Sequence, residues 1–367
     1  MVFLILVLVG LLAFANGSND NCKGVATLVG FGAARPRQAL IWATLTTAIG
    51  AAISFWLAAG LIASFSTGLF AQGTPLEGAF FVAVLIGAIG WVLFATFTGL
   101  PVSTTHAIMG GLLGSGVVAL STGQIRWEEL GSKFAVPLAL GPVLSLVVVY
   151  LVSWPIRSLV RRYEGRCVCV VQQQPMSGTC AASVVASPAL NVVTDTEANC
   201  SAASPAVTVS TSAAANAVHW ATSGLVGFAR GWNDAPKIAA LSIGTLSVAG
   251  VPNGTAVAFA VVTVAMAVGG FVAGRRVLET MARNLTPLPL AESLTASLTT
   301  ATLVCTASWV GLPVSTTHVS TGAIIGAGLR NDPGEVRWRK VGEIVLSWVT
   351  TLPVAALISA VALYLMR

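Results

Sequence analysis

Charge is scarce in this sequence. Only 9% of its 367 residues are Asp, Glu, Lys or Arg, whereas a soluble globular domain carries about 25%. A chain with so few charges cannot cover a water-facing surface, so an ordinary soluble protein is excluded. The net charge is +6, but the basic residues form no stripe, and we expect no nucleic-acid partner.

Hydrophobic residues are abundant instead. They make up 55% of the chain, whose mean hydropathy is +0.85. Apolar runs recur, for example at residues 78–97, 252–272 and 344–366, and about 20 residues suffice to cross a bilayer. The runs lack the strict alternation of barrel strands, and backbone groups in lipid must be satisfied internally. The sequence therefore predicts an all-α, multi-pass protein of the plasma (inner) membrane.

Two motifs occur twice. GLPVSTTH begins at Gly99 and, unchanged, at Gly311, while ANGSNDNCKGVA from Ala15 matches ARGWNDAPKIAA from Ala229. The offsets between copies are nearly equal, at 212 residues (311 − 99) and 214 residues (229 − 15). Two independent motifs with almost one offset indicate a duplicated unit of about 150 residues.

The stretch between the copies differs in composition. Residues 172–215 are rich in Ser, Thr, Ala, Val and Pro, which is typical of a loose linker. We therefore expect a first transmembrane repeat at 1–166, a low-complexity linker at 167–215 and a second transmembrane repeat at 216–367.

Four of the six cysteines, Cys167, Cys169, Cys180 and Cys200, lie in this linker. We expect them to be reduced, unpaired thiols. A metal site built from Cys167, Cys169 and Cys180 is an alternative, but its spacing fits no standard zinc pattern and no histidine joins it.

The basic loops predict the orientation of the two repeats. Lys and Arg are grouped in four places: Arg35 and Arg37; Arg157, Arg161, Arg162 and Arg166; Arg275, Arg276 and Arg283; and Arg330, Arg337, Arg339 and Lys340. Residues 64–78 and 247–254 have neither. By the positive-inside rule, equivalent loops lie on opposite sides. We expect two inverted-topology repeats with broken helices, about 10–12 membrane segments in all, a cytoplasmic linker and both termini outside.

The GLPVSTTH motif has the chemistry of a helix start that binds an anion. Its proline disfavours helix in the preceding residue, and a serine is a good N-cap. The free N–H groups and the positive dipole end then face a ligand, together with three hydroxyls per copy. We expect these hydroxyls to wrap a tetrahedral oxyanion: Ser103, Thr104, Thr105, Ser315, Thr316 and Thr317. The alternative is that Ser-Thr-Thr only caps a helix. His106 and His318, on the first turns, are either structural or a proton relay.

The other motif places carboxylates in apolar surroundings. Asn19 and Asp20, and Asn233 and Asp234, supply oxygens suited to a hard cation, together with carbonyls that glycine breaks at Gly17 and Gly231 would free. An intramembrane carboxylate is a functional-site hypothesis by default. The alternatives are helix capping or pairing with a lysine.

With both motifs duplicated, the chain resembles the inorganic phosphate transporter (PiT) family of cation–phosphate symporters. GRRVLETMARNLTPL, from Gly274, is similar to a stretch that precedes the second motif in that family. The resemblance implies import of orthophosphate with sodium or protons, often by a homodimer, and no cofactor besides the coupling ion. It assigns the Ser-Thr-Thr hydroxyls to phosphate and the Asn-Asp pairs to the coupling cation.

The sequence departs from the family pattern at four positions. Where the first motif commonly ends in asparagine, this chain has Lys23, and Lys237 is its mate. Where many members have a glutamate in each half, it has Thr47 and Ser297. Each lysine follows its aspartate by three residues, a spacing at which the side chains meet on a helix. We predict that the lysines replace a bound cation: each would pair with its aspartate, contact the phosphate or lose its proton, and the last would allow proton coupling. The alternative is that they extend to the membrane interface.

Three other functions fit parts of the pattern. A carrier of sulfate would use the same hydroxyls and helix ends, but sulfate has no proton to donate to an acceptor such as Asp20. An anion channel would not need paired cation and anion motifs. An intramembrane enzyme could use Ser103 and His106, but no third residue orients them and a duplicate pair has no obvious use in hydrolysis. We therefore expect a transporter and not an enzyme.

Overall fold

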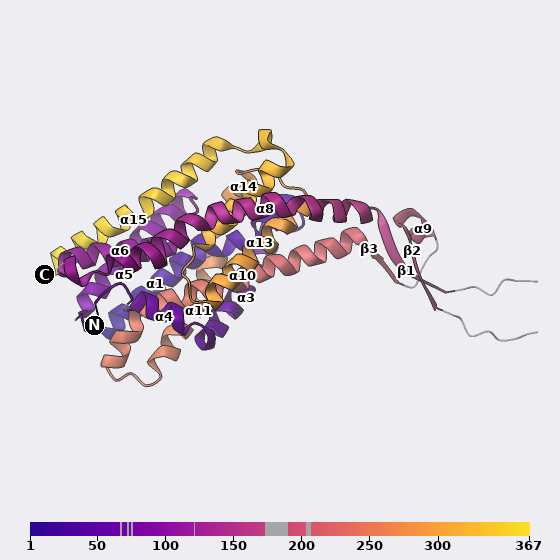
Figure 1. Ribbon diagram of the computed structural model, residues 1–367. Helices are drawn as coiled ribbons and strands as arrows, with labels where there is room; N and C mark the ends of the chain where they lie inside the picture. The colour runs from indigo at the N-terminus through magenta and orange to yellow at the C-terminus, as the bar shows by residue number, and fades with distance from the viewer. Residues whose placement is uncertain (67, 72, 75, 121, 173–189, 203–206) are drawn as a thin grey trace, which may run out of the picture.

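The computed structural model describes residues 1–66, 68–71, 73–74, 76–120, 122–172, 190–202 and 207–367 (Figure 1). Long helices form a bundle, and a small β-sheet projects from one end of it on the extended helices α8 and α10. Both termini lie at the opposite end of the bundle. There, the guanidinium of Arg367 donates a hydrogen bond of 2.8 Å to the Val118 carbonyl.

The two halves contain matching series of helices. The first half consists of α1 (Val2–Asp20), the 3₁₀ helix η1 (Asn21–Val25), α2 (Ala26–Phe31), α3 (Pro36–Leu57), α4 (Ala59–Ser66), α5 (Gly78–Thr98), α6 (Thr104–Ala119), η2 (Thr122–Gln124), α7 (Trp127–Glu129), the π-helix η3 (Leu130–Ala135) and α8 (Val136–Tyr163). The second consists of α10 (Thr211–Val248), α11 (Gly254–Ala273), α12 (Arg275–Arg283), α13 (Leu290–Trp309), α14 (Thr316–Asn331), η4 (Pro333–Glu335) and α15 (Trp338–Met366).

Six helical segments within the described residues are long and apolar enough to cross a membrane: Val2–Phe31, Pro36–Leu57, Gly78–Thr98, Trp127–Tyr163, Gly254–Ala273 and Trp338–Met366. The helices α6 and α14 have 16 residues each and are shorter than a full crossing. The prediction of an all-α polytopic membrane protein is confirmed.

Both copies of GLPVSTTH interrupt a helix as predicted. The helix α5 ends where Gly99 adopts a left-handed φ of +73°, and α13 ends just before Gly311, whose φ is +72°. This conformation favours glycine. A new helix starts five residues later in each copy, where Ser103 Oγ accepts the His106 N–H at 3.2 Å and Ser315 Oγ accepts the His318 N–H at 3.3 Å. The predicted N-caps are confirmed.

The predicted glycine breaks at Gly17 and Gly231 are wrong. The helix α1 passes through Gly17, and α10 continues through Gly231 and Pro236. These glycines instead allow close backbone approach. A Cβ on Gly17 would lie 2.0 Å from the Met266 carbonyl oxygen, and one on Gly231 would lie 2.1 Å from that of Thr47.

The two halves pack on each other reciprocally. The first helix of each half contacts the next long helix of the other half: α1 packs on α11, and α10 packs on α3. The last helix of each half covers the interrupted helix pair of the other, as α15 packs on α5 and α6 and α8 packs on α13 and α14. The main buried apolar cluster therefore draws on both halves, for example Val9 and Val84 from the first and Val262 and Leu363 from the second.

The linker is not uniformly loose. It contains β1 (Arg166–Gln172), β2 (Leu190–Thr196), α9 (Glu197–Ala202) and β3 (Val207–Ser210), and the strands form an antiparallel sheet in the order β2-β1-β3. Helix α10 already begins at Thr211, before the expected boundary. The valine-rich, β-branched segments that looked like low complexity suit a pleated sheet.

The expectation of unpaired linker thiols is also wrong for two residues. Cys167 and Cys200 form a disulfide, whereas Cys169 is free. Cys180 lies outside the described residues.

Candidate functional site

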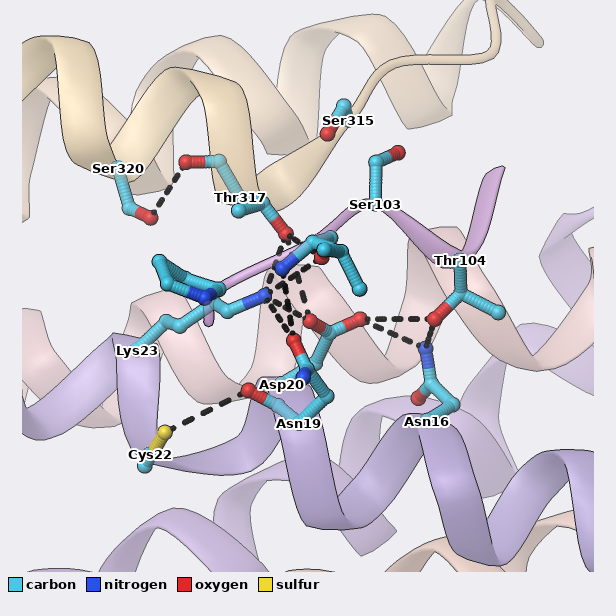
Figure 2. Close-up of polar contacts among 12 residues, drawn as sticks. Asn16, Asn19, Asp20, Cys22, Lys23, Ser103, Thr104, Ser315, Thr317 and Ser320 are labelled. Atoms are coloured by element: carbon cyan, nitrogen blue, oxygen red, sulfur yellow. Dashed lines mark hydrogen bonds and ion pairs between the residues drawn. The ribbon is translucent and has the colours of Figure 1, made fainter. Parts of the chain in front are cut away.

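Both motif pairs meet inside the bundle, where Asn16 contacts both Asp20 and Asp234. Figure 2 shows the first Asn-Asp motif beside both Ser-Thr-Thr turns. The residues that meet there share nearly complete burial, and we call them the polar core: Asn16, Asn19, Asp20, Lys23, Thr104, Thr105, Arg230, Asn233, Asp234, Lys237 and Thr317. None is more than 4% exposed. Such burial of ionised groups is costly unless they are paired and hydrogen-bonded, so their partners decide what the site can do.

Lys23 links the two halves. It lies on η1 and forms an ion pair with Asp20, and its Nζ also donates to Asn19 Oδ1 at 2.9 Å. Two further bonds reach the GLPVSTTH segments, to the Val102 carbonyl at 2.8 Å and to Thr317 Oγ1 at 2.6 Å. Figure 2 shows the ammonium pointing at Asp20 and Thr317. The ammonium group is fully coordinated by oxygen.

Lys237 repeats this arrangement with the halves exchanged. Its Nζ lies 3.3 Å from Asp234 Oδ1 and donates to the Val314 carbonyl at 2.8 Å and to Thr105 Oγ1 at 2.8 Å. Each lysine therefore pairs with the aspartate of its own half and binds a threonine hydroxyl of the other. The predicted lysine–aspartate contacts are present, and both lysines are buried, at 3% and 1% exposed.

The two carboxylates share one donor. Asn16 Nδ2 lies 2.8 Å from Asp20 Oδ2 and 3.3 Å from Asp234 Oδ2. The same amide is 3.1 Å from Thr104 Oγ1, which lies 3.3 Å from Asp20 Oδ2. Asn16 thus bridges the carboxylates of Asp20 and Asp234, which are 214 residues apart in sequence (234 − 20), at the contact between the two halves.

The asparagines of the motif hold the backbone of the interrupted segments. Asn19 accepts the Val102 N–H at 3.0 Å and donates to the Leu100 carbonyl at 3.0 Å. Asn233 donates to the Val314 carbonyl at 3.0 Å and to Asp234 Oδ1 at 2.9 Å. Both asparagines therefore position the extended residues that precede the Ser-Thr-Thr turns.

Ser103, Ser315 and Thr316 lie at the two helix starts, and each is no more than 4% exposed. Next to them, the rings of His106 and His318 stand 4.6 Å apart. His106 Nδ1 lies 2.8 Å from Ser103 Oγ, but His318 Nδ1 instead lies 3.4 Å from the Leu138 carbonyl. Both rings line an apolar cavity of about 560 Å³.

Thr47 and Ser297, the positions aligned with family glutamates, are buried but lie outside the polar core. Ser297 Oγ is 2.9 Å from Thr27 Oγ1 and 3.4 Å from Ser223 Oγ. A small hydroxyl cluster thus occupies a place where an ionised group would need a counter-charge.

Sequence reasoning missed Arg230 and Asn16. Arg230 is 1% exposed, and its Nη2 donates to Asn21 Oδ1 at 2.5 Å and lies 3.5 Å from Asn16 Oδ1. Its Nε and Nη1 have no hydrogen-bond partner among the described residues. The signal was available, because an arginine within an apolar helix is itself a functional-site hypothesis. Asn16 gave no such signal.

The repeated motifs, now brought together in one buried core, can be compared with known proteins. The sequence profile of the phosphate transporter family matches residues 16–359, which include both copies of each motif except Ala15. The chain belongs to the phosphate transporter family. Phosphate is the substrate of this family. Because the chain belongs to a transporter family and contains several long apolar helices, it is an integral membrane protein.

Similar proteins extend over nearly the whole chain. A protein of Rhizobium meliloti (strain 1021) named "Probable low-affinity inorganic phosphate transporter" is 30% identical, with 98% of this chain and 96% of that protein covered. One of the same name from Mycobacterium leprae (strain TN) is 26% identical over 100% of this chain and 79% of its own. The structure titled "The sodium-dependent phosphate transporter" has the same fold, with a TM-score of 0.79 and 23% sequence identity. The match covers 100% of this chain and 98% of that one.

Proposed function

We propose that this protein is a secondary active transporter that imports inorganic phosphate, coupled to sodium or protons, by alternating access. One observation carries the proposal: each half supplies an aspartate–lysine pair whose ammonium binds a Ser-Thr-Thr hydroxyl of the other half. A site shared equally between two packed halves can be opened to either side by their relative movement, which suits a carrier.

The phosphate would lie between the two helix starts. Ser103, Thr104, Thr105, Ser315, Thr316 and Thr317 supply hydroxyls, and the first N–H groups of α6 and α14 add donors. Lys23 and Lys237 already touch two of these hydroxyls, so a bound phosphate would accept from ammonium and hydroxyl together. In the structure these ammonium and hydroxyl groups hydrogen-bond to one another.

Fixed charge in the polar core bears on the coupling ion. Lys23, Lys237 and Arg230 carry three positive charges, and Asp20 and Asp234 carry two negative ones, so the core has a net charge of +1. A monovalent phosphate neutralises this charge without any added cation, whereas a divalent one leaves a single negative charge. We therefore propose that Lys23 and Lys237 replace bound cations and that at most one sodium ion or proton accompanies each divalent phosphate. Asn19, Asp20, Asn233 and Asp234 would hold that cation.

Positions of the connecting segments support inverted repeats. The loops that flank the α5–α6 pair meet through the bridge between Phe70 and Ile125. The segments that flank α13–α14 meet through the 2.9 Å bond from the Arg337 N–H to the Leu285 carbonyl. We place the first junction outside, near the termini, and the second in the cytoplasm, with the basic loops and the linker.

The outer face suits a plasma (inner) membrane location and a homodimer. On α8, Leu151 and Trp154 are 65% and 64% exposed, and such apolar side chains contact lipid or a second subunit. Crosslinking in membranes, followed by electrophoresis, would show a band at twice the chain mass for a homodimer.

Transport in proteoliposomes tests the main proposal. Labelled phosphate should accumulate against its gradient when a sodium or proton gradient is imposed, and unlabelled sulfate should not compete. Downhill flux alone would indicate a channel, and equal competition by sulfate would indicate a general oxyanion carrier. A Ser103–His106 enzyme would instead consume its substrate and would not accumulate it.

A further inference from the structure

Three cysteine side chains meet in the linker, whose sheet projects from one end of the helix bundle (Figure 1). Cys167 and Cys169 are two residues apart on β1, so they face the same side of the strand, and Cys200 lies on α9. The three sulfur atoms lie within 4.8 Å of one another, and those of Cys169 and Cys200 are 3.1 Å apart. This spacing brings three sulfur ligands to one point.

The cluster is the interior of this small unit. Among the residues of the sheet and α9 whose burial is described, only these three cysteines are buried, at 1%, 3% and 1% exposed. The neighbouring strand residues Val192 and Val207 are 70% and 56% exposed. A unit of this size without an apolar core needs a covalent or metal crosslink to keep its shape.

In the structure the crosslink is the disulfide between Cys167 and Cys200, with Cys169 as a free thiol. The basic loops place this unit in the cytoplasm, where thiols are kept reduced. A thiol reductant such as glutathione supplies two electrons: the S–S bond breaks, each sulfur takes a proton, and the reductant becomes a disulfide. The reduced unit then holds three thiols and no crosslink.

We propose that the reduced cluster binds one thiophilic d¹⁰ cation, zinc(II) or copper(I), through Cys167, Cys169 and Cys200. Thiolates select these ions over harder ones. Metal–sulfur bonds of about 2.3 Å place sulfur ligands about 3.8–4.0 Å apart, a separation within the 4.8 Å limit that contains all three sulfur atoms. Binding replaces three S–H bonds by three metal–sulfur bonds and releases three protons, with no change of oxidation state.

The metal would join the ends of the two halves. Strand β1 follows α8 after two residues, and β3 leads directly into α10. Thr211 is the first residue of α10, and its Oγ1 lies 2.5 Å from the Tyr163 carbonyl oxygen and 2.8 Å from the Arg166 carbonyl oxygen. A metal that rigidifies the sheet therefore fixes the distance between the last helix of one half and the first helix of the other.

Metal content of the full-length protein tests this site. The protein, purified in detergent under reducing, anaerobic conditions, is titrated in separate arms with zinc(II) and with copper(I) against a competing chelator. We expect about one equivalent of one of these ions per chain. Cys200→Ser should reduce the occupancy at least tenfold, while Cys305→Ser, on α13, should leave it unchanged.

A second variant separates a metal from a disulfide. Cys200→His keeps a metal ligand but cannot form the disulfide, so it should retain zinc that Cys200→Ser loses. Equal loss of metal in both variants, or metal retained in Cys200→Ser, would overturn the site. So would alkylation trapping that finds the Cys167–Cys200 disulfide complete in growing cells. The inference depends on the cytoplasmic linker and is independent of phosphate uptake, which the metal titration does not measure.

Discussion

Lys23 donates a 2.6 Å hydrogen bond to Thr317, a residue 294 positions away in the other half of the chain. The same bond recurs with the halves exchanged, from Lys237 to Thr105 at 2.8 Å. Each bond occupies a hydroxyl of a helix start that we propose to bind phosphate. If phosphate binds there as proposed, it has to compete for these hydroxyls or share them with the ammonium groups, and substrate binding would then be coupled to contact between the halves.

Removing the shared hydroxyls tests this coupling. Thr105→Val or Thr317→Val keeps the side-chain shape but deletes one bond to a charged partner, which costs about 1.5–3 kcal/mol. We expect the apparent affinity for phosphate to fall roughly tenfold or more, measured as uptake against phosphate concentration. Thr302→Val, at an exposed position of α13, is the control. Unchanged affinity in both core variants at normal expression would contradict a hydroxyl-based phosphate site.

The serines of the same turns should behave differently. Ser103→Ala or Ser315→Ala removes a helix N-cap as well as a hydroxyl, and loss of a cap costs about 1 kcal/mol of stability. We expect weaker phosphate uptake together with a lower Tm in detergent. A lower Tm with full phosphate affinity would assign these serines to capping alone.

The lysines should decide the ion requirement. In Lys23→Asn/Lys237→Asn the polar core loses two positive charges and keeps both carboxylates, so a mobile cation is needed to replace them. We expect phosphate uptake by the double variant to require more sodium per phosphate than uptake by the wild type, measured under separate sodium and proton gradients. A strictly sodium-driven wild type, with a stoichiometry that the double variant leaves unchanged, would refute the replacement of cations by lysine.

Arg230 should contribute through its charge. Arg230→Gln removes the third positive charge beside Asn16 and Asn21, and we expect at least a tenfold loss of apparent phosphate affinity, which is about 1.4 kcal/mol. Arg230→Lys keeps the charge and should retain most of the phosphate affinity that Arg230→Gln loses. If both variants lose the same activity, the planar guanidinium and its packing are responsible instead.

The close approach at Gly231 should limit stability. In Gly231→Ala the new methyl group meets the Thr47 carbonyl, and overpacking of this kind costs about 1–3 kcal/mol. Gly244→Ala lies on the same helix with nothing within 4 Å of its Cβ, so it should be neutral or stabilising by up to about 1 kcal/mol. Thermal unfolding of the purified variants compares them. An equal Tm would mean that α3 and α10 can separate without cost.

The orientation can be tested with exposed cysteines. Val192→Cys, 70% exposed on β2, should be protected from an impermeant thiol reagent in intact cells, whereas Val248→Cys, 93% exposed at the end of α10, should react. We also expect Cys180 and Cys200 to remain unlabelled from outside. Labelling of Val192→Cys without cell lysis would place the linker outside and reverse the orientation.

The sequence by itself determined that this is a helical membrane protein, that its motifs are duplicated, and where its helices are interrupted and capped. Low charge and long apolar runs require membrane helices, because lipid cannot hydrogen-bond a bare backbone. Gly99 and Pro101, with their copies, interrupt the helices through local sterics, and Ser103 caps the new helix across three residues. The spacing of Asp20 and Lys23 predicted their pairing for the same reason, since neighbours on one helical turn need no tertiary information.

Only the tertiary structure decided what crosses between the halves. No local rule brings Lys23 to Thr317, Asn16 to Asp234, or Arg230 to Asn21, because those contacts depend on how whole helices pack. Gly17 and Gly231 were misread as breaks because glycine serves both flexibility and close approach, and only the facing carbonyls of Met266 and Thr47 distinguish the two. The linker cysteines illustrate the same limit: spacing along the chain suggested Cys180, whereas folding of the sheet brought Cys200 to Cys167 and Cys169.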